Sequence, residues 1–366
     1  MVAGTAMCGS RIGVGVLLLG AMMSLPGCRT EGTRMVDRLR FELRELPPVP
    51  QGVGGGMSGL VGETLVLAGG SYFTTPPDQG GTKLWTDEVL ILGLQASQWQ
   101  SAGRLPRLLA YGAAVSTRKG LLLAGGCDAE KHYGTAYLLT LDGDRLRIAE
   151  LPALPRPTAY MGGSLLANTV YLAGGREGPE TPAALRTFWS LDLDRPAEGW
   201  RELEPWPGPA RMLPGVVAQD GAVYVFSGAD LLPGDDGVVG RQYLTDAYRY
   251  RPGKGWSRVA DLPHPAAAAP VASWGRDRVL VFGGDHGRLA ALGSSLGDAH
   301  PGFGRALLCY HTADDTWTHL HDLPPLPVTT TAIRRDDTIL IPTGEDRPGR
   351  RTPKVYAVEP RPLLRR

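Results

Sequence analysis

The sequence carries almost no net charge. Its 38 Lys and Arg residues are balanced by 37 Asp and Glu residues, which leaves a formal charge of +1. Proteins that bind nucleic acid gain affinity by releasing counterions, and this requires a clear surplus of basic residues. The composition therefore predicts no nucleic-acid partner.

The chain also lacks a hydrophobic run long enough to span a membrane as a helix. Its N-terminal apolar run, Ile12 to Met23, has twelve residues and follows Arg11, whereas a spanning helix needs about 20 residues. These features predict a signal peptide over residues 1–27. The next residue, Cys28, ends the segment Leu25-Pro26-Gly27-Cys28, which resembles a bacterial lipobox. We therefore predict that Cys28 is lipidated and becomes the mature N-terminus.

An exported lipoprotein is the expectation that follows. Residues 28–36 would form a short tether, and residues 37–366 would form the folded domain. The protein would then lie in the periplasm and meet the membrane only through its lipid anchor. An ordinary secretory signal with an incidental cysteine is the alternative, and the oligomeric state has no signal in the sequence.

Cysteine is scarce, with four residues in the chain. Cleavage before Cys28 would remove Cys8 and leave Cys28, Cys127 and Cys309. If Cys28 carries lipid, one disulfide at most is possible, so the fold cannot depend on a disulfide framework. A metal site is not predicted either, because His319 and His321 share one face of a predicted strand but have no third ligand.

Long uninterrupted stretches are rare, because the chain has 50 glycines and 31 prolines. Few segments run ten residues without one of them, which excludes a helical bundle. Together they make up about 22% of the chain, below the roughly 25–30% that is typical of low-complexity disorder. Since 43% of the residues are hydrophobic, a packed core is expected. The length suits two ordinary domains or one large all-β domain.

An internal repeat organises these glycines. An aliphatic run that ends in a small pair, usually Gly-Gly, occurs six times, and successive copies lie 56, 49, 53, 56 and 60 residues apart. Between the copies, an aromatic residue is followed by Leu-Pro or a near match, as in Trp99 with Leu105-Pro106 and Trp317 with Leu323-Pro324. The six runs are Leu65 to Gly70, Leu121 to Gly126, Val170 to Gly175, Val223 to Gly228, Val279 to Gly284 and Ile339 to Gly344.

A period near 50 residues with short β-rich runs resembles the kelch repeat, whose units are four-stranded propeller blades. We therefore predict an all-β fold, a six-bladed β-propeller, in preference to a β-sandwich with chance glycines. The sixth unit ends after its third strand, at Lys354 to Glu359. Leu39 to Leu46 matches the missing fourth strand, with Phe41 roughly where Trp stands elsewhere. The N-terminal strand is thus predicted to close the ring against the C-terminal blade and remove its open edges.

This topology brings two sets of residues to one mouth of the central channel. One set precedes the first strand of a blade, and the other directly follows the small pairs. Three long loops, Ser71 to Asp87, Ala229 to Asp246 and Asp285 to Gly304, are expected to wall a pocket there. The predicted mouth residues are Arg107, Arg156, Arg211, Ser71, Cys127, Arg176, Ala229, Asp285 and Glu345.

The last of these loops carries the most specific motif. Gly344-Glu345-Asp346-Arg347-Pro348-Gly349-Arg350-Arg351-Thr352 resembles the catalytic loop of the bacterial N-acetylneuraminate epimerases, or sialic acid mutarotases, whose pattern is Gly-Glu, two residues, Pro-Gly, one residue, Arg-Thr. Gly52 to Gly70 and Ala110-Tyr111-Gly112 resemble the blades that follow that loop in those enzymes. Since the Glu loop comes last here, the chain resembles a cyclically permuted member of the family. A closed ring tolerates such a change.

The resemblance implies an isomerase that interconverts the α and β anomers of N-acetylneuraminate by acid–base ring opening. Glu345 is the implied base and Arg351 the implied partner of substrate charge. Arg350 is a candidate ion-pair partner of Glu345. Acid–base catalysis suffices for this reaction, so no cofactor or metal is expected. The alternative is a non-catalytic kelch propeller that binds a glycan or a protein. Further candidate substrate-binding residues, chosen by their place at the mouth, are Arg211, Arg156, Asp285 and Arg176.

Overall fold

Each sheet in the structure is antiparallel and is built largely from strands that follow one another in the chain. The structure is a computed structural model that describes residues 1, 39–93, 95–234 and 238–362. The predicted signal peptide, the tether and Cys28 lie outside the described residues. Among the described residues, no helix is long and apolar enough to cross a membrane.

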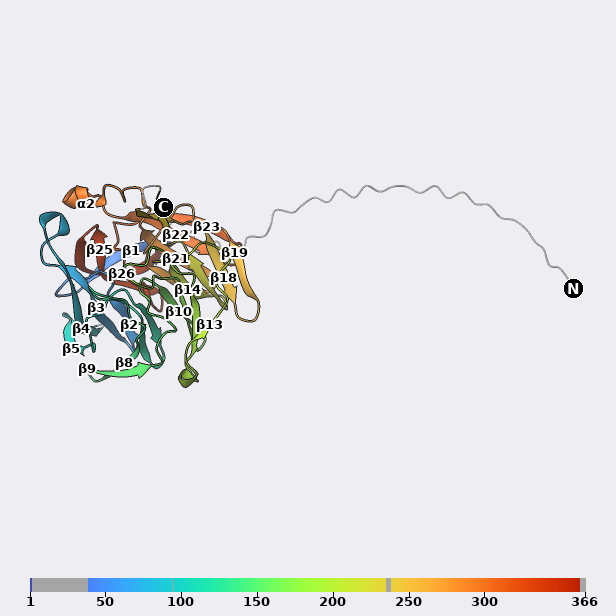
Figure 1. Cartoon of the computed structure of the whole chain (residues 1–366), viewed down its shortest axis with the longest axis horizontal. Coiled ribbons are helices and arrows are strands. Elements are labelled where there is room, and N and C mark those ends of the chain that lie inside the picture. The colour runs from blue at the N-terminus through green and yellow to red at the C-terminus, as the bar shows by residue number, and fades with distance from the viewer. Residues whose placement is uncertain (2–38, 94, 235–237, 363–366) are drawn as a thin grey trace. The chain divides into compact units, whose positions relative to one another are not determined.

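Six four-stranded sheets form the blades of a propeller, as predicted (Figure 1). In each blade the first strand lies innermost. The first three blades are β2(Met57–Val61), β3(Thr64–Phe73), β4(Lys83–Gly93), β5(Gln100–Arg104); β6(Ala113–Thr117), β7(Gly120–Ala124), β8(Ala136–Asp142), β9(Arg145–Leu151); and β10(Gly162–Leu166), β11(Thr169–Ala173), β12(Phe188–Asp192), β13(Arg201–Glu202).

The next two blades are β14(Gly215–Gln219), β15(Ala222–Phe226), β18(Ala247–Arg251), β19(Gly255–Val259); and β20(Val271–Trp274), β21(Arg278–Gly284), β22(Gly304–His311), β23(Thr316–Asp322). The sixth blade is β24(Ile333–Arg335), β25(Thr338–Arg347), β26(Arg350–Pro362) and β1(Leu39–Leu46). A separate hairpin, β16(Ala229–Pro233) and β17(Val239–Tyr243), projects from the fourth blade.

The N-terminal strand closes the ring, which confirms the prediction for Leu39 to Leu46. β1 pairs with β26 from Leu39 opposite Pro362 to Leu46 opposite Val355. Phe41 is 1% exposed, and its ring packs edge-on against Trp274 of the fifth blade at 5.3 Å. Chain ends that are far apart in sequence thus share one blade.

The repeated tryptophans join neighbouring blades, in line with the packing role that their repeat positions predict. Each indole N–H donates a hydrogen bond to a backbone carbonyl just after the outer strand of the preceding blade, at 2.8–2.9 Å. In the sixth blade Phe41 lacks this donor, and its backbone N–H instead donates to Nε2 of His321 at 3.0 Å. The donor–acceptor pairs are Trp99 with Pro47, Trp200 with Pro152, Trp256 with Glu204 and Trp317 with Ala260.

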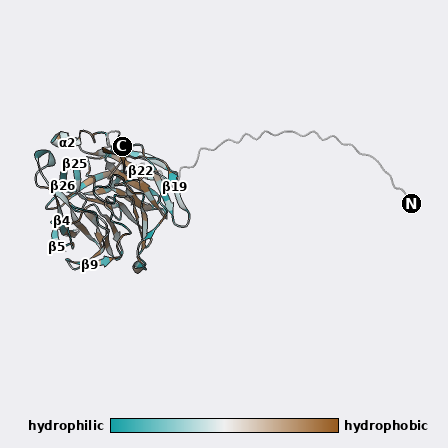
Figure 2. Cartoon of the chain, in the orientation of Figure 1, coloured by the Kyte–Doolittle hydropathy of each residue, from teal (hydrophilic) through white to brown (hydrophobic). Residues whose placement is uncertain are grey.

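The hydrophobic core consists of layers between adjacent blades. One buried cluster, for example, joins Tyr224 and Phe226 of the fourth blade to Val281 and Tyr310 of the fifth. Figure 2 shows the hydrophobic residues concentrated in the inner strands, while outer elements such as β9 and β19 are more hydrophilic. Burial of these layers, rather than any disulfide, stabilises the ring; Cys127 and Cys309 are buried and are not joined to each other.

A ring of backbone hydrogen bonds surrounds the central channel. One residue per blade, directly before the innermost strand, has a left-handed backbone with φ between +54° and +67°. Its N–H donates to the carbonyl of the equivalent residue in the preceding blade, at 2.7–3.1 Å, and the bond from Gly55 to Thr329 closes the circle. The ring residues are Gly55, Tyr111, Tyr160, Leu213, Ala268 and Thr329.

The closure of the ring by β1 predicts a specific loss of stability. Phe41→Ala should lower the free energy of unfolding by about 3–5 kcal/mol, because it removes a fully buried aromatic ring from the contact between two blades. Chemical denaturation of the purified protein measures this change. Arg40→Ala, an exposed neighbour on the same strand, is the control and should change stability by less than about 0.5 kcal/mol. Equal effects of the two variants would contradict the role of β1.

Candidate active site

Six equivalent backbone bridges confirm which residues meet at one mouth of the channel. In every blade, the residue after the small pair forms an antiparallel bridge with the residue directly before the ring residue. The ring of backbone hydrogen bonds fixes the residue directly before each ring residue. Its bridge partner, the residue after the small pair, must therefore lie at the same edge of each blade. The bridges are Gly54 with Ser71, Ala110 with Cys127, Ala159 with Arg176, Met212 with Ala229, Ala267 with Asp285 and Val328 with Glu345.

Glu345 and Arg351 form an ion pair at this mouth. They lie directly opposite each other on β25 and β26, so their side chains share one face of the hairpin. Nη1 of Arg351 is 2.5 Å from Oε1 of Glu345, and the two side chains are 6% and 17% exposed. The backbone N–H of Gly349, in the turn, also donates to Oε1 at 2.8 Å. The motif that was expected to be a loop is therefore a tight hairpin that presents this pair.

Arg351 is held on three sides. Its guanidinium lies over the ring of Phe73 at 5.4 Å, and its Nη2 is 3.4 Å from the hydroxyl of Tyr111. A Cβ at position 54 would lie 2.5 Å from Nε of Arg351, so glycine there makes room for the guanidinium. Burial alone would lower the pKa of Arg351, but the carboxylate of Glu345 outweighs it and the pKa is raised. Arg351 therefore stays charged at any physiological pH.

Tyr111 connects this pair to a cluster of uncharged groups. Its hydroxyl is 3.0 Å from Oγ of Ser71, and its ring lies 4.8 Å from that of Tyr160. Sγ of Cys127 is 3.8 Å from the hydroxyl of Tyr160. Burial raises the pKa of both the Cys127 thiol and the Tyr160 phenol. Both groups are therefore neutral near pH 7, and they can hydrogen-bond a ligand but are poor nucleophiles.

Arg350 does not pair with Glu345, contrary to the prediction. Adjacent residues on a strand point to opposite faces, so Arg350 points away from the Glu345–Arg351 pair. Its Nη1 lies 2.6 Å from Oδ1 of Asp78 and its Nε 2.8 Å from Oδ1 of Asp298. Hydrogen bonds to these two carboxylates raise the pKa of Arg350, and its hydrogen bond lowers the pKa of Asp78. Arg350 thus ties together three segments around the mouth.

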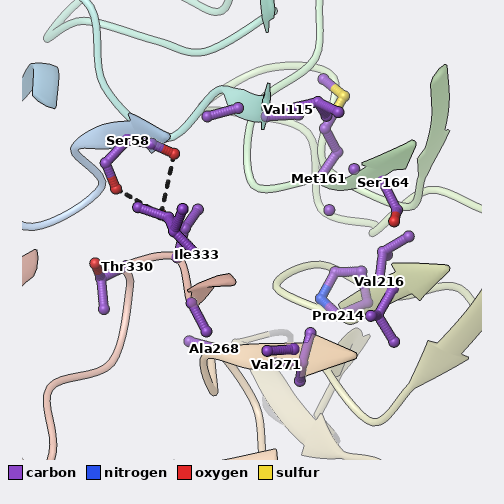
Figure 3. A pocket seen from close by; sticks show the side chains of 18 of the residues that line it. Ser58, Val115, Met161, Ser164, Pro214, Val216, Ala268, Val271, Thr330 and Ile333 are labelled. Carbon is purple, nitrogen blue, oxygen red and sulfur yellow. Dashed lines mark hydrogen bonds between the residues drawn. The ribbon is translucent and has the colours of Figure 1, made fainter. Parts of the chain in front are cut away.

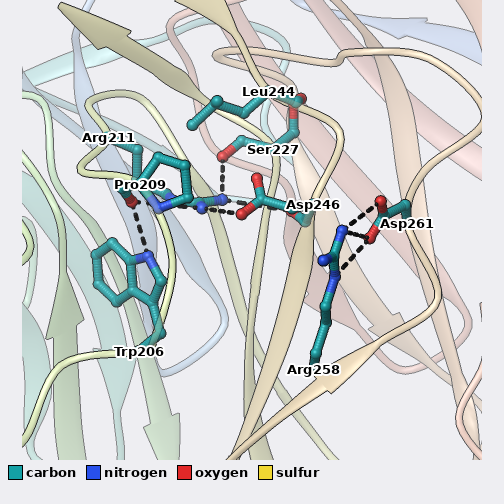
Figure 4. A network of polar contacts seen from close by, with 8 residues as sticks. All are labelled: Trp206, Pro209, Arg211, Ser227, Leu244, Asp246, Arg258 and Asp261. Atoms are coloured by element: carbon teal, nitrogen blue, oxygen red, sulfur yellow. Dashed lines mark hydrogen bonds and ion pairs between the residues drawn. The ribbon is translucent and has the colours of Figure 1, made fainter.

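Arg211 is a packing residue in the structure. Its side chain is fully buried, and Nη2 binds Oδ2 of Asp246 at 2.7 Å (Figure 4). Nη1 donates to the carbonyl of Ser227 at 2.8 Å, and the guanidinium lies between the rings of Trp206 and Tyr248. No face of this guanidinium is open to a ligand, so the structure does not bring Arg211 into the site.

Three other predicted residues lie nearer the surface. Arg156 is 40% exposed and its Nη2 lies 3.6 Å from Oε1 of Glu202, on the outer strand β13. Arg176 is at the mouth, but its Nε donates to the carbonyl of Thr181 at 2.8 Å, within its own loop. Asp285 is also at the mouth, where Oδ2 accepts a hydrogen bond from Tyr243 at 2.8 Å. Of the predicted set, only Glu345 and Arg351 are brought into direct contact.

A cavity of about 320 Å³ occupies the central channel next to this site (Figure 3). Its walls are mostly small or hydroxyl-bearing residues of the innermost strands, such as Ser58, Ser116 and Ser164. Tyr111 and Tyr160 line it as well, so Tyr111, which contacts Arg351, also borders the channel. This volume is near the lower limit for small-molecule sites, about 300 Å³.

Within the described part of the chain, no group of three potential metal ligands is present. His319 binds Asp322 at 2.9 Å, and His321 accepts the backbone bond from Phe41.

Sequence reasoning missed two residues next to the site. Tyr111 was part of a motif that resembles a family blade, but its contact with Arg351 joins the second blade to the sixth, on either side of the first. Lys83 lies in a segment that was expected to be a loop. In the structure, β3 and β4 extend through this segment as a hairpin, and the alternation of Lys83 and Trp85 on β4 was the available signal.

The fold and the residues at the channel mouth together define the class of the protein. It is a six-bladed kelch-type propeller with a Glu–Arg ion pair at one end of its channel. Residues 151–289 match the family model of N-acetylneuraminate epimerase. This part of the chain is therefore similar to the N-acetylneuraminate epimerase family, whose name denotes an isomerase.

Curated relatives with this name come from several bacteria. The chain is 28% identical to N-acetylneuraminate epimerase of Haemophilus influenzae (strain 86-028NP) over 230 residues, 56% of this chain and 58% of the relative. Identity to the Brucella melitensis protein is 33% over 159 residues, 37% of this chain and 40% of the relative. Identity to the Vibrio vulnificus (strain YJ016) protein is 34% over 111 residues, which is 27% of this chain and 28% of the relative. The matches thus span at most about three fifths of these relatives.

The burial of Arg211 predicts a structural rather than a functional defect. Arg211→Met should lower the free energy of unfolding by about 3–5 kcal/mol, because Asp246 would be left as a buried, unpaired charge. Denaturant unfolding measures the loss. Arg156→Met removes an exposed, loosely paired arginine from the segment before the preceding blade and should cost less than about 1 kcal/mol. An unchanged stability in Arg211→Met would show that its ion pair is not structural.

Proposed function

We propose that the protein interconverts the α and β anomers of N-acetylneuraminate. The observation that carries this proposal is the Glu345–Arg351 ion pair at the channel mouth, on the hairpin whose sequence resembles the catalytic loop of the epimerase family. The match of residues 151–289 to that family supports it. A propeller that only binds a partner would not need an enclosed acidic side chain beside the channel.

Glu345 is the proposed base. Interconversion of the anomers breaks the bond between the anomeric carbon and the ring oxygen and forms it again on the other face. Glu345 takes the proton of the anomeric hydroxyl as the ring opens to the keto acid. The ring oxygen takes a proton from water to become a hydroxyl, and Glu345 returns its proton to the hydroxide that is left. Within the described contacts, Oε1 is held by Arg351 and Gly349, which leaves Oε2 to exchange the proton. The steps reverse when the ring closes.

Arg351 then acts through Glu345, whose carboxylate it holds in place. Nη1 of Arg351 holds the carboxylate of Glu345 in one rotamer, and Nη2 of Arg351 faces the hydroxyl of Tyr111. Positioning of the base is a large part of what general-base catalysis needs. The reaction proceeds unaided in water, and acid–base catalysis typically adds about 10²–10⁴-fold. We therefore propose that neither a metal nor a cofactor takes part.

Cellular location and chain order complete the proposal. The lipobox-like segment before Cys28 supports an exported, lipid-anchored protein in the periplasm, where acidic sugars released from glycans would be met. The position of the Glu345 hairpin in the last blade supports a cyclically permuted relationship to the familiar epimerases. Ring closure by β1 is compatible with such a permutation, since every contact between neighbouring blades is kept.

Glu345→Gln tests the catalytic role. We expect the protein-dependent rate of α-anomer decay, followed by proton NMR on freshly released α-N-acetylneuraminate, to fall at least about 100-fold, because glutamine cannot accept the proton. Binding of N-acetylneuraminate, measured by calorimetry, should persist. Asp346→Asn is the matched control, since Asp346 is the adjacent carboxylate on the same strand and points to the other face. A wild-type protein that leaves the decay at its rate in buffer would disprove the proposed function.

Cys28→Ala tests the anchor. The wild-type chain should incorporate radiolabelled palmitate and sediment with membranes, whereas the variant should do neither and should remain soluble in the periplasmic fraction. If both chains are soluble and unlabelled after signal cleavage, the segment is an ordinary secretory signal.

A further inference from the structure

One face of the β3–β4 hairpin is directed at the Glu345–Arg351 pair. Ser71 lies opposite Trp85, and Phe73 lies opposite Lys83. Side chains at directly opposed and alternate positions share a face of an antiparallel pair, so these four belong to one surface. Ser71 contacts Tyr111, and Phe73 lies under the guanidinium of Arg351. This surface is therefore a wall of the candidate site.

Lys83 brings a positive charge to that wall. Its Nζ lies 4.4 Å from the centre of the Tyr111 ring and 4.8 Å from that of Trp85. Two aromatic faces hold the ammonium by cation–π attraction. Among the described residues, no carboxylate lies within ion-pair distance of Lys83, and the side chain is half-buried. The indole N–H of Trp85 is also buried and faces the thiol of Cys127, a weak acceptor that a ligand carboxylate would replace.

Three arginines near the mouth are already engaged. Arg351 pairs with Glu345, and Arg350 pairs with Asp78 and Asp298. Arg176 donates from Nε and Nη2 to carbonyls of its own loop. An anionic ligand that approaches Glu345 therefore finds Arg351 neutralised, whereas Lys83, over the Tyr111 ring, has no carboxylate partner among the described residues.

We propose that Lys83 binds the carboxylate of the acidic sugar. This inference rests on the proposed function, because it is the carboxylate on the anomeric carbon that must be held while Glu345 acts on the hydroxyl of the same carbon. The ammonium gives the charge, the indole N–H of Trp85 supplies a neighbouring donor, and the rings of Trp85 and Tyr111 flank the sugar. Lys83 thereby selects acidic over neutral sugars, and Arg351 is left to position the base.

Binding measurements on four proteins test this role. Calorimetric titration with N-acetylneuraminate and with its methyl ester compares wild type, Lys83→Met, Lys83→Arg and Lys131→Met. Lys131 is the matched control, because it also lies over an aromatic ring, Tyr133 at 5.5 Å, on the hairpin of the next blade. Thermal melting confirms that each variant is folded.

Lys83→Met should weaken binding of the acid at least about tenfold, the loss of one charge-assisted contact, and should leave the already weak binding of the ester unchanged. In the mutarotation assay KM should rise by a similar factor while kcat changes less than about threefold. Lys83→Arg should recover most of the affinity, and Lys131→Met should behave as wild type.

Two results would overturn the assignment. One is an unchanged affinity for the acid in Lys83→Met, in particular if Arg176→Met loses it instead. The other is an equal loss for acid and ester, which would mean that Lys83 only supports the hairpin. Failure of the proposed function gives a different pattern: wild type would bind the acid in a Lys83-dependent way but would not speed the exchange of its anomers.

Discussion

The structure depends on a closed circle of six backbone hydrogen bonds around the channel. Each ring residue adopts a left-handed backbone, which costs up to about 1–3 kcal/mol at a non-glycine position, and five of the six are not glycine. The circle holds them there because each carbonyl receives the N–H of the next blade. The ring in turn fixes the six bridges one residue earlier, and one of these bridges places Glu345 at the mouth.

The sequence was most informative where the repeat is local. A small pair marks a sharp bend in every blade, where the second strand either ends or, in the first and sixth blades, continues past a bulge; Gly126, for example, has φ +106° and lies against the backbone of Ala110. The tryptophans follow the same period, since each indole reaches the preceding blade. Even the split blade was predictable, because Phe41 keeps the aromatic position and loses only the N–H, which the backbone of β1 replaces.

Contacts between distant segments were not predictable. Arg156 lies four residues before the ring residue of its blade and Arg211 only two before that of the next blade; one is exposed and the other is fully buried. The difference lies in Asp246, 35 residues further on, whose carboxylate faces Arg211. Arg350 and Arg351 are adjacent in the motif, and the hairpin sends them to opposite faces. Lys83 became visible only when a presumed loop proved to be paired strands.

In the proposed mechanism, the charged residues of the site have separate roles. Glu345 and Arg351 neutralise each other, Tyr111 bridges them to the hairpin of the first blade, and Lys83 supplies the positive charge that an acidic sugar would meet. The central claim is that this arrangement speeds anomer exchange. Magnetisation transfer between the α and β signals of N-acetylneuraminate at equilibrium measures that exchange directly. The account predicts a rate that rises in proportion to the concentration of wild-type protein, and a rate equal to that in buffer at every concentration would contradict it.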